Sequence, residues 1–251
     1  METVTHFRPN IEILADPEKL AQRTVEIFLA DARKTLSERN AFRVAVSGGQ
    51  TPKRFFQLLG ELPHVAALPW DRIHLFWVDE RCVPPNSETS NYRLAAETFL
   101  TRVPIPKENV HQIPAEYADS GIAAQTYEQT IRTVFSLSPG ELPRFDLIIL
   151  GLGIDGHTGS LFPNSPALLD KDNLACLVHM PNEKLRRITL TPPVLRAASH
   201  LTVLAAGQEK ARILKSVLTL EPDEIRYPIH ILWPVLCKVT WLIDSEAAKL
   251  L

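Results

Sequence analysis

The stretch FDLIILGLGIDGHTGSLFP, residues 145–163, decides the class of fold. It starts with a continuous apolar run and ends in a loop that holds four of the 10 glycines in this 251-residue chain. A continuous apolar run that closes on glycine is typical of a strand buried on both faces of a parallel sheet. Runs of the same form span residues 42–47, 73–78, 200–207 and 238–244.

Helical patterns lie between these apolar runs. Residues 17–38 carry apolar side chains at helical spacing, with Asp16 as the predicted N-cap and Pro17 in the first turn. Further helical patterns cover residues 51–60, 90–100 and 209–218. In the first of these, Thr51 is the predicted cap and Gly60 the predicted stop. The alternation predicts an α/β fold, a mostly parallel sheet flanked by helices.

The sequence indicates one domain over residues 1–251. The 20 prolines fall mostly between the predicted elements, and no repeat, low-complexity tract or clear linker divides the chain. The proline-rich residues 163–193 are predicted to be an irregular addition to this domain.

The composition excludes several classes of partner. With 27 basic and 29 acidic side chains the net charge is -2, so no overall field favours nucleic acid or a membrane surface. Any bound anion must therefore be held by a few local cations. No apolar run is long enough for a membrane span.

The cysteines and the first residues predict a cytoplasmic protein. Cys82, Cys176 and Cys237 are an odd, scattered set that fits neither a disulfide framework nor a zinc site, so we expect reduced thiols. The residues METVTHFRPNIEIL at the start lack a basic region followed by an apolar run, so we expect no secretory signal.

The unusual residues of the chain gather where the predicted strands end. In an open parallel sheet, ligands bind beyond the carboxyl ends of the strands. Four loops follow such ends: SGGQTP at 47–52, DERCVP at 79–84, GIDGHTGS at 153–160 and GQEKA at 207–211. We expect these four loops to form one crevice.

The glycine pair Gly48-Gly49, followed by Thr51, leads from a strand into a helix. Glycines let backbone N–H groups approach an anion, and the helix N-terminus adds a partial positive charge. A plain strand-to-helix turn often needs only one glycine, so the pair and the hydroxyl favour a phosphate site. Ser47 lacks the GxSxG pattern of a nucleophile elbow, which argues against a nucleophile there.

Charged residues at the other strand ends allow two interpretations. Asp79, Glu80 and Arg81 directly follow a buried strand. They form either a solvated strand end with an internal ion pair or an anion site, in which Arg81 offers its guanidinium fork and Asp79 orients it. Arg187 adds another cation. Lys210 is predicted in the first turn of a helix, where the dipole disfavours a cation, and this favours an anionic ligand nearby.

The glycines of the 145–163 stretch also spell a dinucleotide-binding motif. Gly151, Gly153 and Gly156 give GxGxxG, which in such folds opens a helix that is followed by a strand ending in an acid. Here Pro163 comes early and the following residues are rich in proline. The sequence therefore argues against a dinucleotide site.

His157 lies in the same loop, two residues after Asp155. Histidine can take and return a proton near neutral pH, and a nearby carboxylate fixes its tautomer and raises its basicity. We predict that His157 is a general base with Asp155 beside it. No second histidine or cysteine stands at ligand spacing, so no metal site is predicted. The other seven histidines are interpreted as structural.

Together these motifs resemble the 6-phosphogluconolactonase family. SGGQTP, VDERCVP with SNYRLA behind it, FDLIILGLGIDGHTGSLFP, RITLTP and GQEKA occur in order from about residue 40 to residue 215. The resemblance implies a Rossmann-like α/β fold shared with glucosamine-6-phosphate deaminase. It also implies hydrolysis of 6-phosphoglucono-1,5-lactone to 6-phosphogluconate in the oxidative pentose phosphate pathway, without a metal or organic cofactor.

The resemblance further implies roles for individual residues. His157 matches the catalytic base, Asp155 its neighbour, and Arg81 the arginine after Asp-Glu. The residues matched to, or grouped with, substrate and phosphate binding are Gly48, Gly49, Thr51, Asp79, Arg187 and Lys210. Gly159 stands where alanine is common in the family, and we expect this departure to be tolerated.

Two other functions remain open on the sequence. Deaminases of the same fold usually read Asp-Glu-Tyr at residues 79–81 and continue toward Asn-Glu-Pro where this chain reads Leu-Phe-Pro at 161–163. Those differences favour a lactonase over an amino-sugar phosphate deaminase. The third alternative is a sugar-phosphate-binding regulator without catalysis, against which the intact Asp155 and His157 argue.

Overall fold

The main sheet is parallel throughout. The computed structural model describes residues 9–179 and 185–251, and within them seven strands pair in the order β1-β10-β9-β6-β2-β3-β5. These strands span Asn10–Leu14 (β1), Phe42–Val46 (β2), Ile73–Trp77 (β3), Val110–His111 (β5), Leu147–Gly151 (β6), Leu201–Ala205 (β9) and Val239–Asp244 (β10). The predicted α/β fold is confirmed, and the five apolar runs all form strands.

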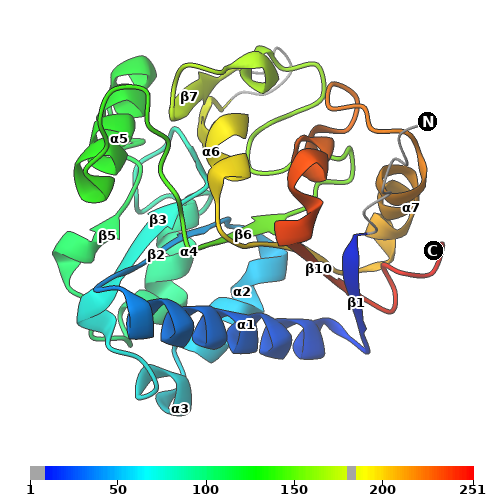
Figure 1. Cartoon of the computed structure of the whole chain (residues 1–251), viewed down its shortest axis with the longest axis horizontal. Coiled ribbons are helices and arrows are strands. Elements are labelled where there is room, and N and C mark those ends of the chain that lie inside the picture. Colours follow the sequence, from blue (N-terminus) through cyan, green and yellow to red (C-terminus); the bar gives the residue numbers. More distant parts are fainter. Residues whose placement is uncertain (1–8, 180–184) are drawn as a thin grey trace.

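Helices cover both faces of this sheet, which explains why its strands are apolar runs. Figure 1 shows α1 (blue) along one side of the sheet and α6 (yellow) on the opposite side. In β6, residues 147–150 are at most 1% exposed. The helices span Pro17–Glu38 (α1), Gln50–Leu59 (α2), Leu62–Val65 (α3), Asn91–Ala95 (α4), Ser120–Phe135 (α5), Pro192–Ala197 (α6) and Ala211–Thr219 (α7).

The two predicted helix starts have different outcomes. The carboxylate of Asp16 accepts a hydrogen bond from the Lys19 N–H at 2.7 Å, so the predicted cap of α1 is confirmed. The predicted cap of α2 is wrong. This helix already begins at Gln50, and its N-cap is Gly49, whose φ of 107° suits glycine and places Thr51 inside the first turn.

A second, antiparallel sheet stands beside the main one, in the order β4-β8-β7. Its strands span Asp79–Arg81 (β4), Ala175–Val178 (β7) and Arg187–Leu190 (β8). The prediction of an irregular 163–193 region is therefore wrong, because extended chain that follows the prolines pairs with β4. The same pairing buries Asp79 and Glu80, so these residues are not a solvated strand end.

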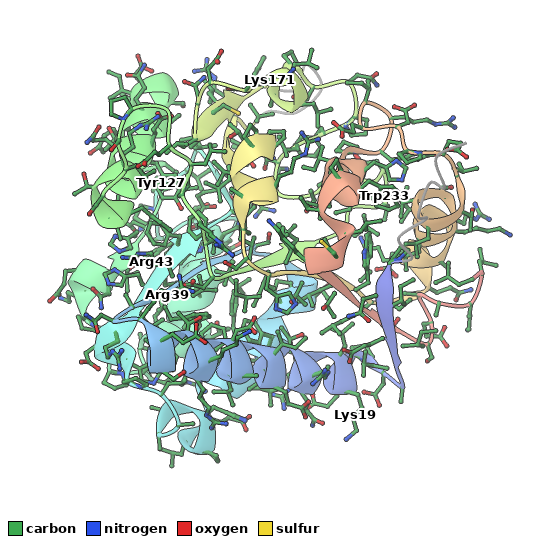
Figure 2. The ribbon with its side chains drawn as sticks, viewed as in Figure 1. Lys19, Arg39, Arg43, Tyr127, Lys171 and Trp233 are labelled. Atoms are coloured by element: carbon green, nitrogen blue, oxygen red, sulfur yellow. The ribbon has the colours of Figure 1, made fainter. Side chains whose placement is uncertain are left out.

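Tyr127 on α5 fixes the point where the chain passes from the main sheet to the second one. Its hydroxyl donates to the Trp77 carbonyl at 2.7 Å and accepts from the Trp77 N–H at 3.0 Å. Burial raises the pKa of this hydroxyl, so it stays a donor. Figure 2 labels Tyr127 on the inner part of α5. This contact satisfies the backbone N–H and carbonyl of the last residue of β3.

Candidate active site

A cleft of about 400 Å³ lies at the carboxyl ends of the main-sheet strands, against the second sheet. Its walls come from the loops after β2, β6 and β9 and from β4, α4 and β8. It brings together all but one of the predicted site residues: Gly48, Gly49, Thr51, Asp79, Arg81, His157, Arg187 and Lys210. Asp155 is not in the wall itself but contacts His157 behind it.

The loop from β2 to α2 presents backbone N–H groups to the cleft. Within the described residues no side chain caps the N-terminus of α2, so the first N–H groups of this helix have no protein partner on the cleft side. Gly48 must be glycine, because a Cβ on it would come within 2.0 Å of the Asn91 side-chain oxygen. This loop is suited to an anion that accepts several hydrogen bonds.

Two arginines face each other across the second sheet. Arg81 on β4 is the register partner of Arg187 on β8. Like charges directly opposite in an antiparallel pair destabilise it unless something offsets them. Arg187 lies over the Phe162 ring at 5.2 Å, and Arg81 donates from Nη1 to the Thr89 carbonyl at 2.6 Å. The Nε of Arg81 is buried and has no partner among the described residues, so the guanidinium keeps N–H donors that the protein does not use.

Asp79 does not orient Arg81 as the sequence suggested. Its carboxylate accepts a hydrogen bond from the Ser160 hydroxyl at 2.6 Å, and no hydrogen bond or ion pair joins it to Arg81 in the described part of the chain. Ser160 in turn donates its N–H to Thr189 on β8 at 3.2 Å. Asp79 therefore ties the glycine loop after β6 to the second sheet.

Lys210 completes the cationic side of the cleft. It lies at the end of the short 3-10 turn Gln208–Lys210, directly before α7 rather than within its first turn. Burial lowers the pKa of its ammonium, while the charges of Glu209 and Asp155 act in the opposite direction. A half-buried ammonium of this kind is stabilised by an anionic ligand.

His157 and Asp155 form a close pair. Nδ1 of His157 lies 2.5 Å from the Asp155 carboxylate, which also accepts the His157 backbone N–H at 3.1 Å. Gly153 leaves room for the ring, since a Cβ there would come within 2.1 Å of Nδ1. Phe162 packs against the ring with a centroid distance of 4.6 Å. The imidazole is therefore held in one orientation.

The pair defines which nitrogen of His157 carries a proton. Burial raises the pKa of the Asp155 carboxyl, but the hydrogen bonds and charge of His157 outweigh burial and leave the pKa below its usual value. An ionised carboxylate only accepts hydrogen bonds, so Nδ1 is the donor. Nε2 then has a lone pair, and it has no hydrogen-bond partner among the described residues.

The cleft also contains residues that the sequence did not single out for a role in the site. Ser47, Gln50, Asn91 and Glu209 line it as well. Ser47 and Gln50 belong to the loop at 47–52 and Glu209 to the loop at 207–211, so the sequence predicted their place in the crevice without a role for each. Asn91 is the first residue of a helix, and its contact with Gly48 exists only in three dimensions.

Residues 9–179 and 185–251 contain neither a metal cluster nor a helix suited to span a membrane. No three His, Cys, Asp or Glu side chains of these residues lie together as a metal site requires. No helix that they form has the length and apolar character needed to cross a membrane.

Comparison with known proteins identifies relatives over nearly the whole chain. Residues 15–241 match the family described as glucosamine-6-phosphate isomerases/6-phosphogluconolactonase. The chain is 37% identical over 241 residues to a protein named 6-phosphogluconolactonase from Synechocystis, with 96% of this chain and 98% of the relative covered. A Nostoc protein of the same name is 35% identical, with 96% and 98% covered.

Solved structures agree with these relatives. The crystal structure of 6-phosphogluconolactonase from Thermotoga maritima is 32% identical, with a TM-score of 0.79 and coverage of 94% of this chain and 99% of that one. A monomeric glucosamine-6-phosphate deaminase, only 19% identical, shares the fold with a TM-score of 0.79 and coverage of 96% and 100%. The chain therefore belongs to the glucosamine-6-phosphate isomerase/6-phosphogluconolactonase family.

Proposed function

We propose that this protein hydrolyses 6-phosphoglucono-1,5-lactone to 6-phosphogluconate. The observation that carries the proposal is the cleft-lining ring of His157, whose Nδ1 is held by Asp155 while Nε2 has no partner in the described part of the chain. The names of the Synechocystis and Nostoc relatives support this substrate. Their alignments cover nearly the full length of both proteins.

The first step of the proposed mechanism is attack by water. Nε2 of His157 takes a proton from a water molecule while the water oxygen bonds to the carbonyl carbon of the lactone. The Nδ1 proton remains in its hydrogen bond to Asp155, which stabilises the imidazolium that forms. General base catalysis of this kind contributes roughly 10²–10⁴-fold to the rate. A lactone is an activated ester, so the mechanism needs no covalent nucleophile.

The second step breaks the ring. The carbonyl oxygen becomes an oxyanion, which the guanidinium of Arg81 stabilises from the wall of the cleft. When the oxyanion collapses, the bond from the carbonyl carbon to the ring oxygen breaks. The imidazolium of His157 then returns its proton to the leaving oxygen. One water is consumed, and the carboxylic acid that forms loses a proton to solvent.

Binding of the substrate phosphate, away from the reacting carbonyl, positions the lactone ring in the cleft. Arg187 and Lys210 supply charge, and the loop that contains Gly48, Gly49 and Thr51 supplies N–H groups at the start of α2. Asp79 lines the same cleft. As a carboxylate it only accepts hydrogen bonds, so it suits a sugar hydroxyl rather than the phosphate.

We also propose a place for the reaction. The substrate named for the relatives belongs to the oxidative pentose phosphate pathway, and we assign this protein to that pathway in the cytoplasm. Its three cysteines are all unpaired, which supports a reducing compartment.

The direct test compares three substrates with the purified protein. We expect hydrolysis of 6-phosphogluconolactone, far weaker hydrolysis of unphosphorylated gluconolactone, and no ammonia from glucosamine 6-phosphate. Because the lactones open unaided, ring opening is followed by NMR at mildly acidic pH with the buffer rate subtracted.

Each other result selects a different function. Ammonia release moves the assignment to the deaminases, and equal rates on the two lactones dismiss the phosphate site. Sugar-phosphate binding without turnover of any of the three substrates favours the regulator.

A further inference from the structure

We propose that Ser47 and Asn91 form a subsite that recognises a hydroxyl of the sugar ring, apart from the groups that hold phosphate and carbonyl. The inference rests on the proposed lactone hydrolysis and adds to it a determinant of specificity. Both residues line the cleft on either side of Gly48, and both are at most 4% exposed.

Ser47 presents a hydroxyl that the protein leaves unused. Its backbone N–H donates to the Ile149 carbonyl at 2.9 Å, so the residue is fixed to β6. Its Oγ is buried and has no hydrogen-bond partner among the described residues. Buried hydroxyls in proteins are nearly always hydrogen-bonded, so an unpaired one in the wall of a cleft indicates a partner that arrives with the ligand.

Asn91 presents an acceptor in a fixed orientation. Its Nδ2 donates to the Asp79 carbonyl at 2.9 Å, which identifies Oδ1 as the atom that points toward Gly48. No described residue donates to Oδ1. An amide oxygen accepts hydrogen bonds and cannot donate them, so it suits a hydroxyl donor rather than an ionised phosphate.

The protein holds Asn91 in place with a buried carboxylate. Glu80 accepts the Asn91 and Tyr92 N–H groups at 2.8 Å each and the Ser90 hydroxyl at 2.9 Å. These bonds tie the first turn of α4 to β4, which also carries Arg81. The strand β4 therefore holds both Asn91 and Arg81, and it fixes the distance between them.

The substrate offers three ring hydroxyls, at carbons 2, 3 and 4. The test measures kcat/KM for the parent lactone and for its 2-, 3- and 4-deoxy analogues, each made by oxidation of the deoxyglucose 6-phosphate. Wild type is expected to lose roughly tenfold on one of the three analogues, the size of one neutral hydrogen bond. Ser47→Ala and Asn91→Ala are expected to lose roughly tenfold on the parent but nothing further on that analogue.

A matched control uses another unpaired buried hydroxyl. Thr202 on β9 is fully buried and its Oγ1 has no partner among the described residues, but it does not line the cleft. Thr202→Val is expected to keep the wild-type rates on all four lactones. This control separates recognition of the sugar from general effects of removing a buried hydroxyl.

Two results overturn the inference while the proposed function stands. One is a wild type that hydrolyses all three deoxy lactones as well as the parent, which needs no variant to fold. The other is a penalty of Ser47→Ala and Asn91→Ala that is equal on every lactone. A wild type that does not open the parent lactone faster than buffer instead overturns the proposed function itself.

Discussion

Among the described residues, His157 and His200 each form a close pair with a carboxylate, with nearly the same geometry and different surroundings. Nδ1 lies 2.5 Å from the carboxylate in the His157–Asp155 pair and 2.6 Å in the His200–Asp31 pair. The second nitrogen differs. Nε2 of His200 lies 3.0 Å from the Thr240 hydroxyl, whereas Nε2 of His157 has no partner in the described part of the chain. The pair alone does not make a base, because a free lone pair is also required.

The two pairs also belong to opposite edges of the sheet. His200 precedes β9 and lines a second polar cleft, of about 440 Å³, beyond the amino ends of the strands. There Arg39 pairs with Asp146 at 2.7 Å, so these two charges are matched within the protein. Figure 2 labels Arg39 beside Arg43, near one end of α1. In the first cleft, by contrast, Arg81 and Arg187 are register partners, which brings two cations to one wall of that cleft.

Replacement of each histidine by alanine is expected to affect kcat differently in the two pairs. His157→Ala is expected to lower kcat by roughly 10²–10⁴-fold with little change in KM, because the imidazole acts in the transition state. His200→Ala is expected to keep kcat within a few-fold of wild type. Steady-state kinetics on 6-phosphogluconolactone with folded variants checks both, and a kcat of His157→Ala near wild type removes His157 as the base.

Replacement of a lysine in each cleft is expected to change the affinity for 6-phosphogluconate in one cleft only. Lys210→Ala is expected to weaken binding of 6-phosphogluconate about ten- to hundredfold, since a hydrogen bond to a charged group is worth about 1.5–3 kcal/mol. Lys238→Ala, which removes a cation from the second cleft, is the matched control. Calorimetry with both variants measures the difference, and equal affinities for the two variants contradict the phosphate assignment.

The same lysine predicts a dependence on pH. Burial lowers the pKa of Lys210 below the ordinary value of 10.5. The ammonium binds phosphate below that pKa, so affinity for 6-phosphogluconate is present at neutral pH and falls as pH rises through it. Lys210→Arg keeps its charge and is expected to bind evenly over the same alkaline range. A fall of equal size in wild type and Lys210→Arg argues against Lys210 as the titrating group.

The smallest expected effect is on stability. Here we expect His200→Ala to have a larger effect than His157→Ala, the opposite of their effects on kcat. His200→Ala removes hydrogen bonds to Asp31 and Thr240 and is expected to lower the free energy of unfolding by about 0.5–1.5 kcal/mol. His157→Ala, in a loop at the cleft, is expected to change it less. Urea unfolding measures both, and a larger loss for His157→Ala shows that its pair is structural.

The sequence predicts the main sheet better than the second sheet, for a physical reason. β2, β3, β6, β9 and β10 are continuous apolar runs, and that pattern is local. β4 consists of three charged residues that become a strand only by pairing with β8, far along the chain. The helix α5 was also missed, although Asp119, which accepts the Gly121 N–H at 2.7 Å, was a cap signal.

In the candidate site, too, the sequence predicts the features that are local in the chain and misses contacts between distant residues. The glycine loops and His157 are visible as motifs, because each loop is continuous in sequence. The placement of Asn91 against Gly48 depends on Glu80 holding the start of α4, and no sequence pattern carries that contact. The partner of Asp79 was likewise assigned to the neighbouring Arg81, whereas the fold brings Ser160 to it.

The most direct test of the account is the position of the proton on His157. Nitrogen NMR of the free protein, with the ring in its neutral form and the signals assigned through His157→Ala, reports which nitrogen is protonated. The account predicts the proton on Nδ1, shared with Asp155, and a bare Nε2 in the cleft. A proton on Nε2 would contradict it, because the ring could then not take a proton from water at the carbonyl.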